Sequence, residues 1–174
     1  VAFLVVTSCA FGGNPVRSGS AGASELLINP WSRTASWAEG NTANVVGLES
    51  LYGNIAGLAF TDGLQAGFAN SQWLVGSGIQ LNAAAFAAPT GNDGVLGIHI
   101  TNMNYGDIDV TTTDLPDGGA GTYRPTASII GIGYSKKFTQ SIFGGINIKL
   151  YSSSISNLTA TGVCFDAGVQ YVTG

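Results

Sequence analysis

The sequence predicts an all-β membrane protein, an antiparallel β-barrel of the outer-membrane type, on three observations. Charged residues make up only 9% of the 174 residues, although apolar residues reach an ordinary 45%. Glycine occupies 26 positions, well above its share of roughly 7% in an average protein. The apolar residues recur with a period of two along most of the chain, as they do in strands. Soluble domains carry about 25% charged residues, and disordered chains have few apolar ones, so both classes are disfavoured.

No segment is long and apolar enough for a membrane-spanning helix, which needs about 20 mostly apolar residues. Residues 63–92 include no Asp, Glu, Lys or Arg, but glutamine, asparagine and glycine interrupt the apolar residues there. A stretch that is uncharged without being uniformly apolar is typical of membrane strands, whose faces alternate between lipid and lumen. The net charge of −4 argues against nucleic acid as a partner.

Residues 1–12 resemble the end of a secretory signal peptide, because an apolar run too short to span a membrane is followed by small residues. A cut after Ala10 or Gly12 fits signal peptidase. Residues 6–9 also fit a lipoprotein cleavage box in which Cys9 is acylated, and a buried first strand is a further alternative. The start of the coding sequence is expected to be missing.

Residues 13–62 are predicted to be a Gly/Ser-rich tether followed by a helical segment inside the barrel. Within them, residues 25–60 carry apolar residues at steps of three and four, which is near the helical period. Several glycines interrupt that pattern. We therefore expect short helices and turns rather than one long helix.

Residues 63–174 are predicted to form about six strands of an incomplete barrel. One face of each clear strand is large and apolar, and the other is Gly, Ser, Asn, Gln or a lone charge. A small and weakly polar second face is typical of a crowded barrel interior, whereas a strand facing water would carry more Lys, Glu, Thr and Arg. The predicted strands are 64–74, 79–88, 95–103, 128–135, 145–151 and 162–172.

The connections alternate in length, as outer-membrane barrels alternate short periplasmic turns with long outer loops. Residues 89–93 and 136–140 are short connections, 104–124 is long, and 152–159 is intermediate. Aromatic residues near strand ends predict the girdle that marks the membrane interfaces. The girdle residues are Tyr134, Phe138, Tyr151 and Tyr171. A soluble β-sandwich with tyrosines at its strand ends is the alternative.

Six strands are too few for a single-chain membrane barrel, because the smallest known has eight. Backbone groups left unpaired in lipid are costly. Either several chains assemble into one barrel, or the sequence is the N-terminal portion of a longer protein, which is the interpretation we favour.

No pattern of catalytic or metal-binding residues is present. His99 is the sole histidine, and we expect it to face the lumen or to pack structurally. The sequence lacks a G-x-S-x-G nucleophile elbow, and it lacks phosphate-binding and dinucleotide-binding fingerprints. The two cysteines, Cys9 and Cys164, form no metal-binding motif. We expect no enzyme activity and no cofactor.

The long connection 104–124 is rich in aspartate, and an aspartate pair two residues apart could begin a Ca²⁺ site, since Ca²⁺ prefers several oxygen ligands. A solvated acidic outer loop is the simpler interpretation. If the loop binds anything, a protein partner is expected, because exposed loops on rigid scaffolds commonly carry function. The candidate residues are Tyr105, Asp107, Asp109, Asp114, Asp117 and Tyr123.

The segments SGSAGASELLI (18–28) and LESLYGNIAGL (48–58) resemble the N-terminal region of PorV/PorQ-type outer-membrane proteins, which are related in fold to FadL fatty acid transporters. Asn54, Ala56 and Gly57 match the Asn-Pro-Ala-Gly core of that family, with Ile55 in place of proline. Members of that family also tend to carry a Gly-rich run, of which this sequence keeps the arginine, Arg33, but loses most of the glycines. Three further segments resemble strand-end and turn segments of the family: residues 105–109, 134–138 and 164–174.

The resemblance implies a barrel of about 14 strands in the outer membrane, with an N-terminal hatch in its lumen and a chain about twice this long. It implies a non-catalytic component of the type IX secretion system of Bacteroidetes, in which the lipid of the outer membrane surrounds the barrel. Such a component binds the C-terminal signal domains of cargo and carries them from the translocon to the attachment complex. Asn54, Ala56 and Gly57 are then structural hatch residues. The alternative function is a FadL-like channel for hydrophobic small molecules.

Overall fold

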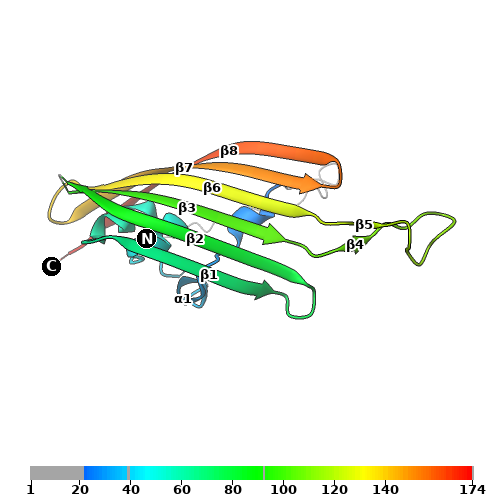
Figure 1. The fold of residues 1–174 in the computed structure, drawn as a ribbon. Helices are drawn as coiled ribbons and strands as arrows, with labels where there is room; N and C mark the ends of the chain where they lie inside the picture. The colour runs from blue at the N-terminus through cyan, green and yellow to red at the C-terminus, as the bar shows by residue number, and fades with distance from the viewer. Residues whose placement is uncertain (1–21, 39, 92, 174) are drawn as a thin grey trace, which may run out of the picture.

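The protein, studied as a computed structural model whose description covers residues 22–38, 40–91 and 93–173, is mostly antiparallel β-sheet with short helices on one face (Figure 1). This confirms the predicted all-β class. The predicted signal segment, residues 1–12, lies outside the described residues, and so do Cys9 and the tether as far as residue 21. Within the described residues, no helix is long and apolar enough to cross a membrane.

Six long strands form one sheet in the order β1-β2-β3-β6-β7-β8, and each pair of neighbouring strands is antiparallel. All six predicted strands are confirmed, with slightly shifted ends. Within the described residues the sheet is open, and β1 and β8 are its edges. The strands are β1 (Gln65–Trp73), β2 (Ile79–Gly91), β3 (Gly94–Asn104), β6 (Thr126–Lys137), β7 (Ile142–Ile155) and β8 (Leu158–Tyr171).

The β2–β3 and β6–β7 connections at one end of the sheet are short, whereas the other end carries two turns and the long β3–β6 connection (Figure 1). The long connection between β3 and β6 includes a two-stranded ribbon of β4 (Ile108–Asp109) and β5 (Thr122–Tyr123), which extends beyond the sheet. The expected intermediate connection 152–159 is wrong. There β7 and β8 continue to Ile155 and Leu158, joined by a tight turn in which Ser156 takes a left-handed φ of 55°.

The described residues include four short helices, which confirms the expectation of short helices and turns instead of one long helix. All lie on one face of the sheet, which we call the inner face; the opposite face is the outer face (Figure 1). We use "hatch" for residues 24–60. Its helices are η2 (Ser24–Leu27), α1 (Ser32–Ala35), η3 (Gly47–Leu51) and η4 (Ile55–Phe60).

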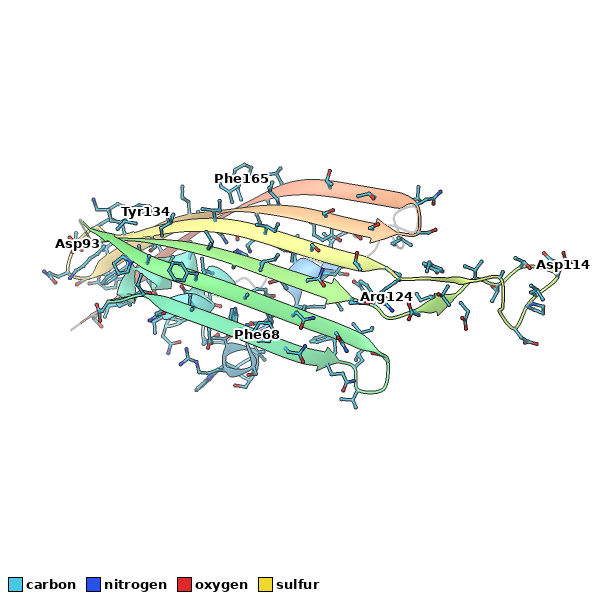
Figure 2. The ribbon with its side chains drawn as sticks, in the orientation of Figure 1. Phe68, Asp93, Asp114, Arg124, Tyr134 and Phe165 are labelled. Carbon is cyan, nitrogen blue, oxygen red and sulfur yellow. The ribbon has the colours of Figure 1, made fainter. Side chains whose placement is uncertain are left out.

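The core lies between the hatch and the inner face of the sheet. Large hatch side chains meet small sheet side chains, because alanine and glycine on the strands let the hatch approach closely. One buried cluster joins Leu51, Ile55 and Leu58 of the hatch to Ala85, Ala87 and Val95 of the sheet. Among the described residues nothing covers the outer face in this way, and its large apolar side chains are exposed (Figure 2).

Candidate functional site

The outer face carries a continuous apolar band across all six strands. The strand register places Phe86, Ile98, Ile132, Ile148 and Phe165 in one row across five neighbouring strands. These five side chains are 42–75% exposed. Contiguous apolar surface of this extent marks a membrane or protein contact. The outer apolar band comprises Phe68, Phe86, Leu96, Ile98, Ile100, Ile130, Ile132, Tyr134, Ile146, Ile148, Leu150, Val163, Phe165 and Val169.

The height of the band matches a lipid bilayer. On β8 the outward side chains are apolar from Val163 to Tyr171, which is about 27 Å at about 3.4 Å per residue. A tilt of about 40°, typical of membrane barrels, reduces this to about 20 Å of height, near the apolar band of about 25 Å in such proteins. The strands are therefore long enough to span the hydrocarbon layer.

Beyond the band, toward the ribbon, the outer face changes abruptly to uncharged polar side chains. Asn82 accepts a hydrogen bond from Asn70 at 2.6 Å, and Asn102 donates one to Ser128 at 2.8 Å. We call the two rows the polar belt. One row is Asn70, Asn82, Asn102, Ser128, Ser152 and Thr161, and the next is Gln72, Gln80, Asn104, Thr126, Ser154 and Thr159.

At the opposite, short-turn end, three predicted girdle residues lie exposed beside the band. Tyr134, Phe138 and Tyr171 are 40%, 66% and 67% exposed, and Figure 2 shows Tyr134 near the Asp93 end. The assignment of Tyr151 to the girdle is wrong. Its side chain packs with the inner-face cluster of Leu81, Met103 and Ala127 and donates a hydrogen bond to Glu25 Oε2 at 3.0 Å.

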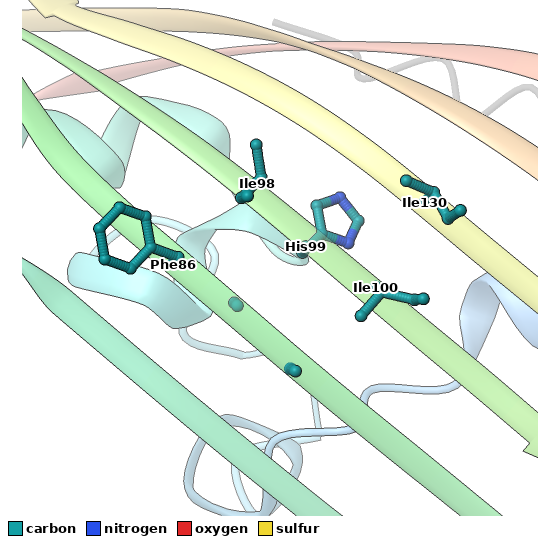
Figure 3. Close-up of a pocket in the computed structure, with 7 residues that line it drawn as sticks. Phe86, Ile98, His99, Ile100 and Ile130 are labelled. Atoms are coloured by element: carbon teal, nitrogen blue, oxygen red, sulfur yellow. The ribbon is translucent and has the colours of Figure 1, made fainter.

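A shallow apolar hollow of about 270 Å³ lies in the sheet at β2, β3 and β6 (Figure 3). It arises because Ala84 is small where its neighbours on the outer face are large. The larger lining side chains are Phe86, Ile98, Ile100 and Ile130.

Polar side chains join the hatch to the inner face. Asn54 caps η4 by accepting a hydrogen bond from the Ala56 N–H at 3.2 Å, and its amide donates to the carbonyl oxygens of Thr42 and Val169. Gln170 Nε2 donates to the carbonyl oxygens of Ala43, at 2.8 Å, and Val45, at 3.2 Å. The bonds to Thr42, Ala43 and Val45 pair carbonyl groups of the irregular hatch backbone, and the bond to Val169 ties the hatch to β8.

We call these contacts between the hatch and the inner face the seam, and two further contacts belong to it. The Ser135 hydroxyl lies 3.1 Å from the Ala56 carbonyl oxygen, and Ala56 itself is fully buried. At Gly57 an added Cβ would overlap the Val45 carbonyl oxygen. Of the three residues that match the family core, Asn54 and Ala56 contact the sheet, and Gly57 packs against the hatch backbone at Val45.

The inner face also carries an ion pair, Lys149–Asp166, with Nζ and Oδ2 separated by 2.6 Å. Lys149 is 9% exposed at its side chain and Asp166 is 42% exposed. Asn147 Nδ2 lies 3.1 Å from the Leu51 carbonyl oxygen and 3.4 Å from His99 Nε2. The expected inward position of His99 is thus observed. Only the inward positions of its members on strands 145–151 and 162–172 could have pointed to this cluster in advance.

Because only Asp166 is well hydrated, the two halves of the pair are expected to respond unequally to substitution. Asp166→Asn leaves the buried ammonium of Lys149 without its partner, at a cost of about 2 kcal/mol after allowance for the exposure of Asp166. Lys149→Met keeps the volume and leaves Asp166 to water, at a cost below about 1 kcal/mol. Urea unfolding of both variants measures the difference, and equal losses would contradict this asymmetry.

The candidate loop 104–124 does not present its residues as one surface. Asp107 pairs with Arg124 at 2.7 Å, and the hydrogen bond from that guanidinium lowers the pKa of the Asp107 carboxyl. Asp109 and Tyr123 lie in the ribbon, where Tyr123 is opposite Ile108. Asp114 and Asp117 are exposed, and Figure 2 shows Asp114 toward the tip. The Tyr105 hydroxyl donates to Glu25 Oε1 in the hatch, so this side chain is not grouped with the loop aspartates, and its assignment to a partner surface stays a prediction.

Glu25 thus accepts hydrogen bonds from two tyrosines, Tyr105 and Tyr151. Burial raises the pKa of the Glu25 carboxyl, but the bonds from Tyr105, the Glu25 backbone and Tyr151 outweigh burial, so the pKa is lowered. Burial and the bond to Glu25 raise the pKa of the Tyr105 phenol. We call the three side chains the Glu25 clasp, which holds η2 against the ribbon end of the sheet.

The docking of η2 on the sheet is expected to weaken at both low and high pH. The lowered pKa of Glu25 stabilises the clasp above the unfolded value of 4.5, and that stability is lost as pH falls through the folded pKa. The raised pKa of Tyr105 stabilises it below the unfolded value of 10.0, and that stability is lost as pH rises through the folded pKa. Hydrogen exchange of residues 24–31 should show greatest protection between these limits. In Glu25→Gln the acid limb disappears, whereas Asp62→Asn, at an exposed carboxylate, keeps it.

The chain matches no model of a known protein family, and a search of curated proteins finds no significantly similar sequence. Within the part of the chain that the structure describes, no three His, Cys, Asp or Glu side chains lie together as a metal ion would require. The fold defines a mostly antiparallel β-sheet protein whose inner face is covered by a short-helical hatch and whose outer face is apolar.

Proposed function

We propose that the sheet forms part of the wall of an outer-membrane β-barrel with the hatch inside its lumen. The observation that carries the proposal is the outer apolar band, which is bounded by the polar belt at one end and by exposed aromatic residues at the other. A membrane wall requires this layering because lipid excludes charge and the aromatic residues favour the interfaces. The small side chains of the inner face, which accommodate the hatch, support the same proposal.

Under this proposal both sheet edges need partner strands. The edge strands β1 and β8 present backbone N–H and C=O groups that lipid cannot pair. Further strands of the same polypeptide, or strands of other copies, would supply these bonds. About 14 strands are expected by resemblance to the PorV/PorQ-type and FadL-like proteins.

We infer further that the protein is a non-catalytic component of type IX secretion that binds the C-terminal signal domains of cargo. This rests on the resemblance of residues 18–28 and 48–58 to PorV/PorQ-type proteins. The ribbon supports it, because a rigid sheet holds an exposed tip, marked by Asp114 in Figure 2, beyond the polar belt. Cargo would meet this tip, and translocon and attachment-complex proteins would bind the same barrel.

Capture of a cargo signal domain by the full-length protein tests this function. Replacing residues 111–120 by a short Gly-Ser turn is expected to abolish capture, because the ribbon strands remain while the tip is removed. The matched control replaces the exposed β1–β2 turn, residues 74–78, and is expected to keep capture. If the ribbon-tip variant captures cargo as well as the unaltered protein, the ribbon is not the binding surface. If the unaltered protein captures none, the secretion function is wrong.

The alternative, a FadL-like channel for hydrophobic small molecules, would use a gap in the barrel wall. The described strands are hydrogen-bonded side by side, with one irregularity between Pro89 and Gly91 at the end of β2. No specific observation in this part of the wall favours the channel. Fatty acid uptake by cells that express the full gene distinguishes the two functions.

A further inference from the structure

A hollow of about 600 Å³ lies between the hatch and the free edge of β1. Of the six long strands, only β1 contributes to its lining, and it contributes from both of its faces. Gln65 and Gly67 point inward, and Ala66 points outward. A hollow lined by both faces of one strand reaches the edge of that strand. The hatch residues used below that line it are Trp31, Arg33, Val46 and Glu49.

The hatch is fixed to β1 beside this hollow. Figure 1 shows α1 next to β1 at the margin of the sheet. Trp31, which precedes α1, packs on β1 so closely that a Cβ added to Gly67 would lie 3.3 Å from its ring. The Leu48 N–H donates a hydrogen bond to Gln65 Oε1 at 3.2 Å. The hollow therefore faces the position that a strand paired with β1 would take.

One wall of the hollow carries a carboxylate that lacks a hydrogen bond. The Glu49 side chain is only 14% exposed, and its Oε1 accepts a hydrogen bond from Arg33 Nε at 2.9 Å. Its Oε2 is buried and has no hydrogen-bond partner among the described residues. The Arg33 side chain is 71% exposed, so water screens much of its charge. Because a buried carboxylate without sufficient partners is costly, Glu49 requires a second donor.

We propose that the strand paired with β1 in the complete barrel places a lysine or arginine side chain in this hollow beside Glu49, an inference that rests on the proposed membrane wall. The backbone of that strand pairs the free N–H and C=O groups of β1, which lipid cannot do. A cation suits the site better than a neutral donor, because the carboxylate is buried and its present partner is exposed. The ring of Trp31 in the same hollow also attracts a cation.

The strand must come from the same polypeptide, outside residues 1–174. In an assembly of copies, the edge of β1 would pair with a free edge of a neighbouring copy, and the free edges are β1 and β8. Neither strand contains a lysine or arginine. A second copy of the described sheet therefore has no side chain at its edges that could supply the cation.

Photocrosslinking in the full-length protein tests which segment occupies the hollow. The photoreactive residue p-benzoylphenylalanine replaces Val46, which lines the hollow and is 44% exposed, and the protein is irradiated in its membrane. Mass spectrometry of the linked peptides is expected to find a segment outside residues 1–174 that has the two-residue alternation of a strand and includes a lysine or arginine. If this variant does not insert, the same probe replaces Leu64, on the β1 side of the hollow.

A double-variant cycle then tests the charge. Glu49→Gln and replacement of the identified basic residue by methionine are each expected to lower the urea midpoint of unfolding. The double variant should lower it no further than the more damaging single variant, because both remove the same ion pair. The matched cycle combines the methionine variant with Glu25→Gln, whose carboxylate pairs with Tyr105 and Tyr151 elsewhere. In that cycle the two losses should add.

Several results would overturn the proposal while leaving the membrane wall intact. Links confined to residues 22–73, links to lipid alone, or a crosslinked dimer would show a different occupant. A linked strand without lysine or arginine, or additive losses in the Glu49 cycle, would show that no cation lies beside Glu49. If the unaltered protein is missing from the membrane fraction, both the wall and the proposed strand are wrong.

Discussion

If the sheet is the membrane wall proposed above, replacement of Ile98 by arginine is expected to destabilise insertion into a bilayer by about 2–4 kcal/mol, the cost of a guanidinium near the middle of a lipid-facing strand. Ile98 lies in the central row of the outer apolar band, between Phe86 and Ile132 on the neighbouring strands, and is 48% exposed. Its side chain makes no contact with the hatch core, so the loss would come from the lipid and not from packing.

The control is Asn102→Arg, four residues further along the same strand and on the same face. Asn102 lies in the polar belt, where an arginine is expected to cost at most about 1 kcal/mol because it reaches the interface. Urea titration of protein folded into vesicles, followed by gel mobility, measures both variants. If the outer face lies in water, both arginines are tolerated, so equal stability of the two variants would contradict the membrane-facing assignment.

The alternation of large and small residues was enough to predict the six strands and the direction of most side chains. Residues 145–151 illustrate this: Ile146, Ile148 and Leu150 point outward as expected, and Asn147 and Lys149 point inward. The same alternation places Tyr151 inward. Its assignment to the girdle used only its nearness to a strand end, and the period of two was the stronger signal.

The Lys149–Asp166 pair and the Glu25 clasp could not be predicted, because both depend on strand register and on the path of the hatch. The register between β7 and β8 is set by the tight turn at Ser156. That turn was hidden because Ser, Thr and Asn near residues 152–159 are as common in loops as on the polar belt of a strand. The contacts of Glu25 link residues 80 and 126 positions apart, which no local pattern encodes.

Replacement of Gly57 by alanine is expected to undock the hatch from the sheet, at a cost of about 3 kcal/mol or more. An alanine Cβ would overlap the Val45 carbonyl oxygen, which is backbone and not a flexible side-chain end. That carbonyl is also held in place, because Gln170 Nε2 donates to it at 3.2 Å and the Val45 N–H donates to the Asn41 carbonyl oxygen at 2.9 Å. Relief of the overlap must therefore break the seam.

Gly53→Ala provides the comparison within the same hatch. An added Cβ there would lie 3.5 Å from Val45 Cγ1, an ordinary van der Waals distance, so the hatch should stay docked. Hydrogen exchange of residues 41–60 reports docking, and gel mobility of the unheated protein reports the sheet in its bilayer. Gly57→Ala should lose the hydrogen-exchange protection of residues 41–60 and keep the gel mobility of the unheated protein, because the outer apolar band does not depend on the seam. If protection of 41–60 survives in Gly57→Ala, the close approach at Gly57 does not hold the hatch. If both readouts are lost together, hatch and wall form one cooperative unit, and the hatch cannot move independently of the wall in any secretion or transport step.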